Sequence, residues 1–509
     1  MIDFRSVYRE SEEKISIYII GLFLLLGLLI LAQSYFSALI ISSVVIAILF
    51  LLLTFFRPLL TIGFLAVYLP FEPFLLKFIP DDLYVFSRYF SEGLIYILAF
   101  SVLYRWLIGK IKFNKSPIDL PFGLFLLVLL AGIVIHLVPI PVALLGARQI
   151  IRFMLIFFIV FYLKPSKVFI QKLTFILFGV VLFQSALGLL QPIFGQPLDN
   201  FLLPSEEKYF ADVTLTQGVN QFWEAGSRIF ATLGRYDLLG NFLYLFLLLG
   251  VGYLYEIPKK NPLFFWFFLF GISALILTAS RSSWFAFLLG LFFIAVIVRR
   301  HKTVLVSFLA FILLAMGYLG LSGLNVRFIT EAPGQSLIER FYETFSYARF
   351  KGEYYGIGRV FWFIQTPLKV IPASPFFGFG PGQFGGGAVA SLHNTTVYDQ
   401  LGLPFGIFGT GGVIDNNWFS LWGETGTLGI IFYAWIFVIL FLISLKTYKI
   451  SSDPFTRAIC LGFAAILIGI TFNAFLSTVF EIRTVAFYLW MYGGFIAVIA
   501  SKNKDKTTE

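Results

Sequence analysis

Three arginines lie at boundaries between polar and apolar stretches. Placing a positive charge there costs free energy, so such residues often mark functional sites. Arg228 precedes a long apolar run, Arg281 lies in a polar link rich in serine, and Arg359 opens a short aromatic segment. A guanidinium group donates hydrogen bonds in a planar fork that suits phosphate or carboxylate oxygens. Interfacial arginines also reach lipid headgroups, so each has a simpler explanation. Around Arg281 the serines form a polar turn, which favours anion binding there. Similar positions are occupied by Arg148, Arg152 and Arg235.

Two carboxylates and one histidine are the candidates for moving a proton. Asp415 stands directly before an apolar run, and Glu424 lies about two helical turns inside that run. His393 belongs to the polar stretch that precedes them. A positioned carboxylate or imidazole can take the proton of an attacking hydroxyl group. Each residue also has a non-catalytic interpretation: Asp415 as a helix cap, Glu424 as a hydrogen-bonding residue within a bundle, and His393 as an ordinary loop residue.

A glycine-rich run at 378–387 contains the pattern G-x-G-x-x-G at Gly380, Gly382 and Gly385. A dinucleotide-binding loop needs this pattern between a strand and a helix, and a P-loop needs a lysine after it. Neither condition is met. We therefore interpret the run as a compact turn whose glycines allow positive φ or close backbone approach, and we expect it to shape an outer cavity.

Cysteine and histidine are too sparse for a metal site. The chain has one cysteine, Cys460, and three scattered histidines. One cysteine cannot form an intramolecular disulfide, and no cluster has the spacing of metal ligands. We predict neither a metal nor another cofactor.

The elements that must position these residues are apolar segments long enough to cross a membrane. Of the 509 residues, 59% are hydrophobic and 13% are charged, and the mean hydropathy is +0.90. A helix of about 20 apolar residues crosses the hydrocarbon core and satisfies its own backbone hydrogen bonds. No run alternates as a barrel strand would. The sequence predicts an all-α polytopic membrane protein with about 12–14 transmembrane helices. The predicted spans are 15–33, 35–56, 58–79, 91–108, 119–138, 143–163, 168–193, 237–256, 262–280, 283–299, 303–321, 418–445, 456–480 and 483–501.

Basic residues predict the orientation of these spans. Lysine and arginine gather in alternate links, and such links stay in the cytoplasm. Both termini are then cytoplasmic, and the net charge of +10 reflects topology rather than a nucleic-acid partner. The basic links lie near 110–115, 164–167, 259–260, 299–302, 446–449 and 502–506.

Two longer segments fall on the outer side, about 194–236 and 322–417. The second mixes charges of both signs with many tyrosines and phenylalanines. Its length indicates a function and its aromatic content argues against disorder, so we predict a large ordered periplasmic loop with helical pieces. The chain then divides into 1–321 with about 11 helices, the loop 322–417, and 418–509 with the last three helices and a cytoplasmic tail.

Several of these stretches together resemble the bacterial O-antigen ligase/polymerase family. The resemblance covers roughly the C-terminal half and depends on five motifs occurring in order. They are RIFATLG at 228–234, TASRS at 278–282, Arg359 with Trp362, PFFGFGPG at 375–382, and Asp415-Asn416 followed by Glu424-Thr425-Gly426.

The resemblance implies a metal-independent membrane glycosyltransferase of the bacterial inner membrane, with its active site facing the periplasm. Such proteins use glycans carried on undecaprenyl diphosphate. It implies that Arg281 and Arg359 hold the donor diphosphate, with Arg228 nearby. The ligases of the family carry a His-Asn pair before the late span, with the histidine as proposed general base. Here Asp415-Asn416 stands in that place, which favours a polymerase and leaves open whether His393 serves as the base.

Three functions follow from these observations, in order of preference. The first is polymerisation of undecaprenyl-diphosphate-linked repeat units into O-antigen or exopolysaccharide. The second is ligation of the glycan to lipid A core or another acceptor. The third is transport of a lipid-linked oligosaccharide by a flippase, which should carry charges through the depth of the bundle rather than at its outer face. The expected partners are the lipid-linked glycan donor, a glycan or lipid acceptor, membrane lipids and a chain-length regulator.

Overall fold

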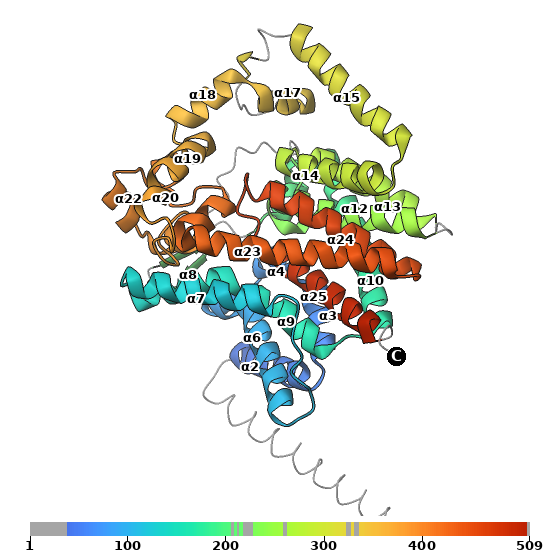
Figure 1. Ribbon diagram of the computed structural model, residues 1–509, viewed down its shortest axis with the longest axis vertical. Helices are drawn as coiled ribbons and strands as arrows, with labels where there is room; N and C mark the ends of the chain where they lie inside the picture. The colour runs from blue at the N-terminus through green and yellow to red at the C-terminus, as the bar shows by residue number, and fades with distance from the viewer. Residues whose placement is uncertain are drawn as a thin grey trace, which may run out of the picture. The chain divides into compact units, whose positions relative to one another are not determined.

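The computed structural model describes residues 38–204, 208–210, 213–216, 228–257, 262–321, 327–329 and 335–505, most of which are helical (Figure 1). The chain forms two compact units, one ending at Thr61 and the other beginning at Ile62. In the first unit, α2 (Ala38–Phe56) is an apolar helix within the predicted span 35–56. The predicted span 15–33 lies outside the described residues. Helix α3 (Pro58–Tyr68) begins at a proline, which is well suited to a first helical turn.

The second unit continues with eight helices up to residue 204. They are α4 (Glu72–Leu76), α5 (Asp81–Arg88), α6 (Phe90–Leu107), α7 (Asp119–Ile135), α8 (Ile140–Ile151), α9 (Met154–Leu163), α10 (Lys167–Phe194) and α11 (Gln196–Leu202). The predicted span 58–79 is divided between α3 and α4. Pro70 is the physical reason, because it has no N–H to donate and keeps the preceding residue out of the helical region. The predicted span 143–163 is also two helices, α8 and α9, which are bent by 53°.

The next part contains a short hairpin and four long helical segments. Strands β1 (Lys208–Phe210) and β2 (Val213–Thr216) pair antiparallel within the shorter predicted outer loop. The helical elements are η1 (Ala231–Leu233), α12 (Tyr236–Glu256), α13 (Leu263–Leu277), α14 (Arg281–Phe292), its continuation η2 (Phe293–Val298) and α15 (Lys302–Leu321).

The described part of the predicted large loop folds into short helices, and its portion from Ile357 onward surrounds a small core. The core contains Trp362, Phe384 and Tyr398, all fully buried, which explains how a segment so rich in loops is ordered. The elements are α17 (Leu337–Tyr342), η3 (Glu343–Phe345), α18 (Tyr347–Tyr355), α19 (Arg359–Gln365), η4 (Thr366–Val370), α20 (Ile371–Ala373), α21 (Gly387–Leu392), α22 (Thr396–Leu401) and η5 (Ile407–Gly409).

The last three helices are α23 (Asn417–Ile450), α24 (Pro454–Asn473) and α25 (Arg483–Asp505), of which α24 and α25 are mostly buried. Helix α24 packs against α12, α14 and α23, while α25 packs against α9 (Figure 1). Small residues allow the closest approach: a Cβ atom added to Gly252 of α12 would lie 2.4 Å from the Ala458 carbonyl oxygen of α24. This small-residue packing is typical of membrane helices.

Seven helices among the described residues are long and apolar enough to cross a membrane. These spans are Asp81–Leu107, Lys167–Phe194, Tyr236–Glu256, Arg281–Val298, Asn417–Ile450, Pro454–Asn473 and Arg483–Lys502, and the bent pair α8 and α9 makes an eighth if it counts as one span. The chain is therefore a helical protein with the character of a multi-pass membrane protein. The predicted total of 12–14 requires shorter apolar helices such as α7 and α13 to cross as well, and it stays a prediction.

Residues of the predicted basic links 164–167, 299–302 and 446–449 lie at one end of the second unit, whereas the link 259–260 lies outside the described residues. Lys167 pairs with Asp453 at 2.6 Å, and Glu256 pairs with Arg299 at 3.2 Å and Arg457 at 2.6 Å. Helices α12, α14 with η2, α23 and α24 each have one terminus at this basic end. Their other termini meet at the cavity described next.

Candidate functional site

Arg281, Arg359 and Asp415 line one cavity of about 890 Å³, although they come from three distant segments. Arg281 begins α14, Arg359 begins α19, and Asp415 precedes α23. Among the described residues, the charged side chains that line the cavity are Arg235, Asp237, Arg281, Arg340, Arg349, Glu353, Arg359 and Asp415. Cationic groups are therefore in excess at its wall.

The serines around Arg281 fix the turn that presents this arginine. Ser280 Oγ lies 2.9 Å from Ser283 Oγ, and Ser283 donates to the Asn241 side chain of α12 at 2.9 Å. Both serines are buried, and Ser280 lines the cavity together with Arg281 and Ser282. The polar turn predicted from the sequence thus anchors α14 to α12.

Glu343 is the charged centre of the arginine cluster and is completely buried. Its carboxylate pairs with Arg281 at 3.2 Å, with Arg340 at 3.0 Å and with Arg349. Arg349 also pairs with Glu353 at 2.8 Å. A buried carboxylate needs such partners, because an unpaired charge in a low dielectric is very costly.

Arg359 and Asp415 form a second ion pair at the cavity. Arg359 donates to one carboxylate oxygen of Asp415 from Nη2 at 2.9 Å and from Nε at 3.3 Å. Its backbone N–H donates to Glu353 at 2.7 Å. Burial acts to lower the pKa of Arg359, but the charges of Asp415 and Glu353 outweigh it and raise this pKa above its usual value.

Asp415 does not cap the helix that follows it. The cap of α23 is Asn416, whose side chain accepts a hydrogen bond from Phe419 N at 3.0 Å. Asp415 itself has φ of 50°, a left-handed conformation that is uncommon outside glycine. This turn leaves the Asp415 carboxylate at the cavity, where 27% of the side chain is exposed.

Arg228 lies behind the cavity wall rather than in it. Its guanidinium carbon is 4.6 Å from the centre of the Tyr236 ring, and Tyr236 lines the cavity. Arg235 lies closer and forms two hydrogen bonds with Asp237, at 3.0 and 3.2 Å. The charge of Asp237 raises the pKa of Arg235, so this cavity cation is also paired.

Glu424 and His393 lie outside the cavity lining. The buried carboxylate of Glu424 accepts a hydrogen bond from Gly382 N at 2.9 Å and so holds the glycine-rich run. That run lies against α8 and α23 and not at the cavity, contrary to our expectation that it would shape it. His393 is exposed at the end of α21, with its ring centre 4.7 Å from that of Phe405.

An apolar groove of about 760 Å³ adjoins the charged cavity. It lies between α13, α14, α15 and α17, and Phe285 lines both the groove and the cavity. Helix α17 also borders both, since Leu337 and Phe341 face the groove while Arg340 faces the cavity. The two spaces together would suit a ligand with an anionic head and a long apolar tail.

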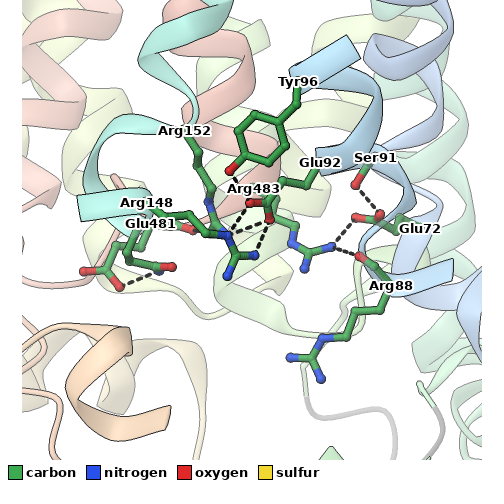
Figure 2. A network of polar contacts seen from close by, with 10 residues as sticks. Glu72, Arg88, Ser91, Glu92, Tyr96, Arg148, Arg152, Glu481 and Arg483 are labelled. Atoms are coloured by element: carbon green, nitrogen blue, oxygen red, sulfur yellow. Dashed lines mark hydrogen bonds and ion pairs between the residues drawn. The ribbon is translucent and has the colours of Figure 1, made fainter. Parts of the chain in front are cut away.

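A second polar network occupies the region around α6 and α8 (Figure 2). Arg148 and Arg152, noted from the sequence, both pair with Glu92 of α6. Arg483 pairs with Glu72 at 3.3 Å, and it also donates to the Arg88 carbonyl oxygen at 2.7 Å. None of these residues lines the charged cavity, and the network joins α4, α6, α8 and α25 instead.

Sequence reasoning noted the charges of the loop but did not assign Glu343, Arg340, Arg349 or Glu353 to a site. A usable signal was the spacing, because Arg340 stands three residues before Glu343 and so on the same helical face. Within the described residues, no group of three or more His, Cys, Asp or Glu side chains could hold a metal ion.

The fold and the cavity define a class: a multi-helix membrane protein with an arginine-lined cavity beside an apolar groove. Comparison with protein-family models gave no match, and comparison with curated proteins gave none either.

Proposed function

We propose that this protein is a membrane glycosyltransferase that polymerises undecaprenyl-diphosphate-linked oligosaccharide repeat units, as in O-antigen or exopolysaccharide synthesis. The observation that supports it is the meeting of Arg281, Arg359 and Asp415 in one cavity beside an apolar groove. Arginines suit a diphosphate, the groove suits a polyprenyl chain, and the carboxylate suits an acceptor hydroxyl group.

In this proposal the arginines stabilise the leaving group. When the bond between the sugar anomeric carbon and the diphosphate oxygen breaks, the bonding electrons remain on the diphosphate. Preorganised donors aimed at that developing charge lower the barrier. Ion pairs with Glu343 and Asp415 hold Arg281 and Arg359 at the cavity before a ligand binds, and the diphosphate would replace part of these contacts.

Asp415 is the proposed general base. The acceptor hydroxyl oxygen bonds to the anomeric carbon while its proton passes to the Asp415 carboxylate. Asp415 lines the cavity and His393 does not, which favours Asp415 for this role. Glu424 is better explained as a residue that positions the glycine-rich run.

The proposed location is the bacterial inner membrane with the cavity facing the periplasm and both termini in the cytoplasm. The lysine- and arginine-rich links support it, because they gather at the end of the second unit away from the cavity. Lipid-linked donors presented on the periplasmic face would then reach the groove from the membrane.

A profile of lipid-linked and surface glycans, with and without the gene, tests the function. Polymerisation is supported if single repeat units remain attached to their acceptor while long chains vanish. Long chains accumulating on undecaprenyl diphosphate would make the protein a ligase. Lipid-linked units trapped on the cytoplasmic side would make it a flippase.

A further inference from the structure

Glu343 occupies the position that a bound anion would take among three arginines. Arg281 comes from a long membrane-type helix, whereas Arg340 and Arg349 come from the segment that folds as α17, η3 and α18. All three line the cavity and all three pair with this one carboxylate. The protein's own side chain therefore neutralises part of the site proposed for the donor diphosphate.

The cluster is much more enclosed than the other ion pair of the cavity. Glu343 has no exposed surface, and Arg340 and Arg281 are 6% and 13% exposed. Arg359 and Asp415 are 41% and 27% exposed, so solvent weakens their attraction. A ligand therefore meets the partly exposed ion pair of Arg359 with Asp415, and a buried arginine cluster whose centre Glu343 already occupies.

We propose that Glu343 is a specificity-determining residue, which acts as an internal competing anion so that the cavity selects two linked phosphates over one. This inference rests on the proposed function, because it assumes that the cavity binds the phosphates of a lipid-linked donor. It adds a residue and a selection rule to that function.

The selection follows from exchange. A ligand that enters the cluster must replace the contacts that the arginines already make with Glu343. Only the difference between the free energies of the new and the lost contacts contributes to affinity. A single phosphate replaces one anionic group by another and gains little. A diphosphate carries a second group for the more exposed Arg359, which lies next to the cluster because Glu353 pairs with Arg349 and also accepts from the Arg359 backbone N–H. The contacts of this second group add to the binding free energy.

Helix α17 borders both the arginine cluster and the apolar groove proposed for the lipid tail. Its residues Leu337, Ile338 and Phe341 line the apolar groove, and Arg340 on the same helix belongs to the cluster. Two probes with the same isoprenoid tail therefore separate the phosphate contribution from the tail contribution.

The test compares binding of farnesyl diphosphate and farnesyl monophosphate to the purified full-length protein in lipid nanodiscs. The variant Glu343→Gln keeps the shape of the side chain and removes its charge. The matched control is Glu339→Gln, which removes a charge from the exposed face of the preceding helix, α17. We expect wild type and the control to prefer the diphosphate by about tenfold or more. We expect Glu343→Gln to bind the monophosphate about tenfold more tightly and to lose most of this preference.

A Glu343→Gln variant that binds both probes more weakly, or that keeps the wild-type preference, would overturn the inference and leave Glu343 a purely structural residue. If uncompensated arginines prevent folding, the double variant Glu343→Gln with Arg340→Gln keeps the net charge and should show the same loss of preference. Wild type that binds farnesyl diphosphate no better than farnesol would instead remove the phosphate site of the proposed function itself.

Discussion

Arg281 joins two parts of the second unit, because it begins α14 and pairs with Glu343 of η3. Arg359 similarly joins α19 to the turn before α23 through Asp415. Each arginine has a defined carboxylate partner and also lines the cavity. At the scale of residues, the site is a set of preformed ion pairs that an anionic ligand would rearrange.

Replacing either arginine tests the proposed diphosphate site. We expect Arg281→Ala and Arg359→Ala each to reduce glycan transfer by about a hundredfold or more, because a lost oxyanion donor typically costs this much. Transfer is measured with membranes that contain equal amounts of each variant. Lys351→Ala, which removes an exposed cation from α18, should retain full transfer. Full transfer in both arginine variants would rule out their role at the diphosphate.

The identity of the base is tested by comparing two substitutions. We expect Asp415→Asn to lose more transfer activity than His393→Ala, because Asp415 lines the cavity and His393 lies outside its lining. Single-turnover rates at saturating donor measure the chemical step. The reverse order would make His393 the better base.

At the scale of elements, the glycine-rich run is packed where side chains do not fit. Gly382 has φ of 77°, and its backbone approaches α8 so closely that a Cβ atom added to Gly146 would lie 2.1 Å from Gly382 N. Glu424 holds the same run from the other side. The run therefore fixes α8 against the start of α23.

The packing of this run predicts that Gly146→Ala destabilises the protein by about 1–3 kcal/mol or more, since neither backbone can move away cheaply. Gly123→Ala in α7 is the control, because nothing lies within 4 Å of the added methyl group. Thermal unfolding in detergent compares the two with wild type. Equal midpoints for both variants would contradict the close packing.

Glu481 lies in the link between α24 and α25, and we expect its titration to make the free energy of unfolding depend on pH. Its carboxylate accepts hydrogen bonds from Gly387 N and Gln149 at 2.9 Å each. Burial nevertheless raises the pKa of Glu481 above its ordinary value. The link also borders the cavity through Thr478 and Ile482.

A pKa that is raised in the folded state determines the direction in which stability changes with pH. The folded protein holds the Glu481 proton to higher pH than the unfolded chain does, so the free energy of unfolding falls as pH rises from the unfolded value, about 4.3, to the folded value. Glu481→Gln lacks this titration. We therefore expect wild type to lose stability relative to Glu481→Gln as pH rises through that window, with no further change above it. A stability difference that is constant over the range would contradict the shift.

At the scale of the whole molecule, the second unit has a basic end and a cavity end, with α12, α14, α23 and α24 connecting them. Charged pairs such as Lys167 with Asp453 mark the first, and Arg281 and Asp415 mark the second. The positive-inside tendency then predicts a cytoplasmic basic end and a periplasmic cavity.

Thiol labelling tests this orientation, since the native Cys460 is buried. A membrane-impermeant maleimide added to intact cells with a permeable outer membrane should label Thr396→Cys and should leave Lys449→Cys unlabelled. Both positions are exposed and lie on the two opposite sides in this orientation. Labelling of Lys449→Cys alone would invert the topology and move the cavity to the cytoplasm.

The sequence alone was sufficient for the helical membrane class, because hydrophobicity and segment length are local properties of the chain. A helix lies in each predicted span from 35–56 onward, and the span interrupted by Pro70 is divided. The sequence does not predict the break between α8 and α9, because no proline or glycine stands at Arg152 and Phe153. Arg152 at the break forms an ion pair with Glu92 of α6, which is a tertiary contact.

The arginines and Asp415 were recognisable from residue type and position, whereas their partners were not. Glu343 lies 62 residues from Arg281, and Asp415 lies 56 from Arg359, so no local pattern links them. Glu424 and His393 have the chemistry of a base, but only packing decided that one holds a glycine-rich turn and the other lies outside the cavity lining. The sequence by itself determined which segments prefer a membrane and which side chains could bind an anion. Tertiary structure decided which charges meet, because burial forces each charged group to find its partner wherever the fold brings one near.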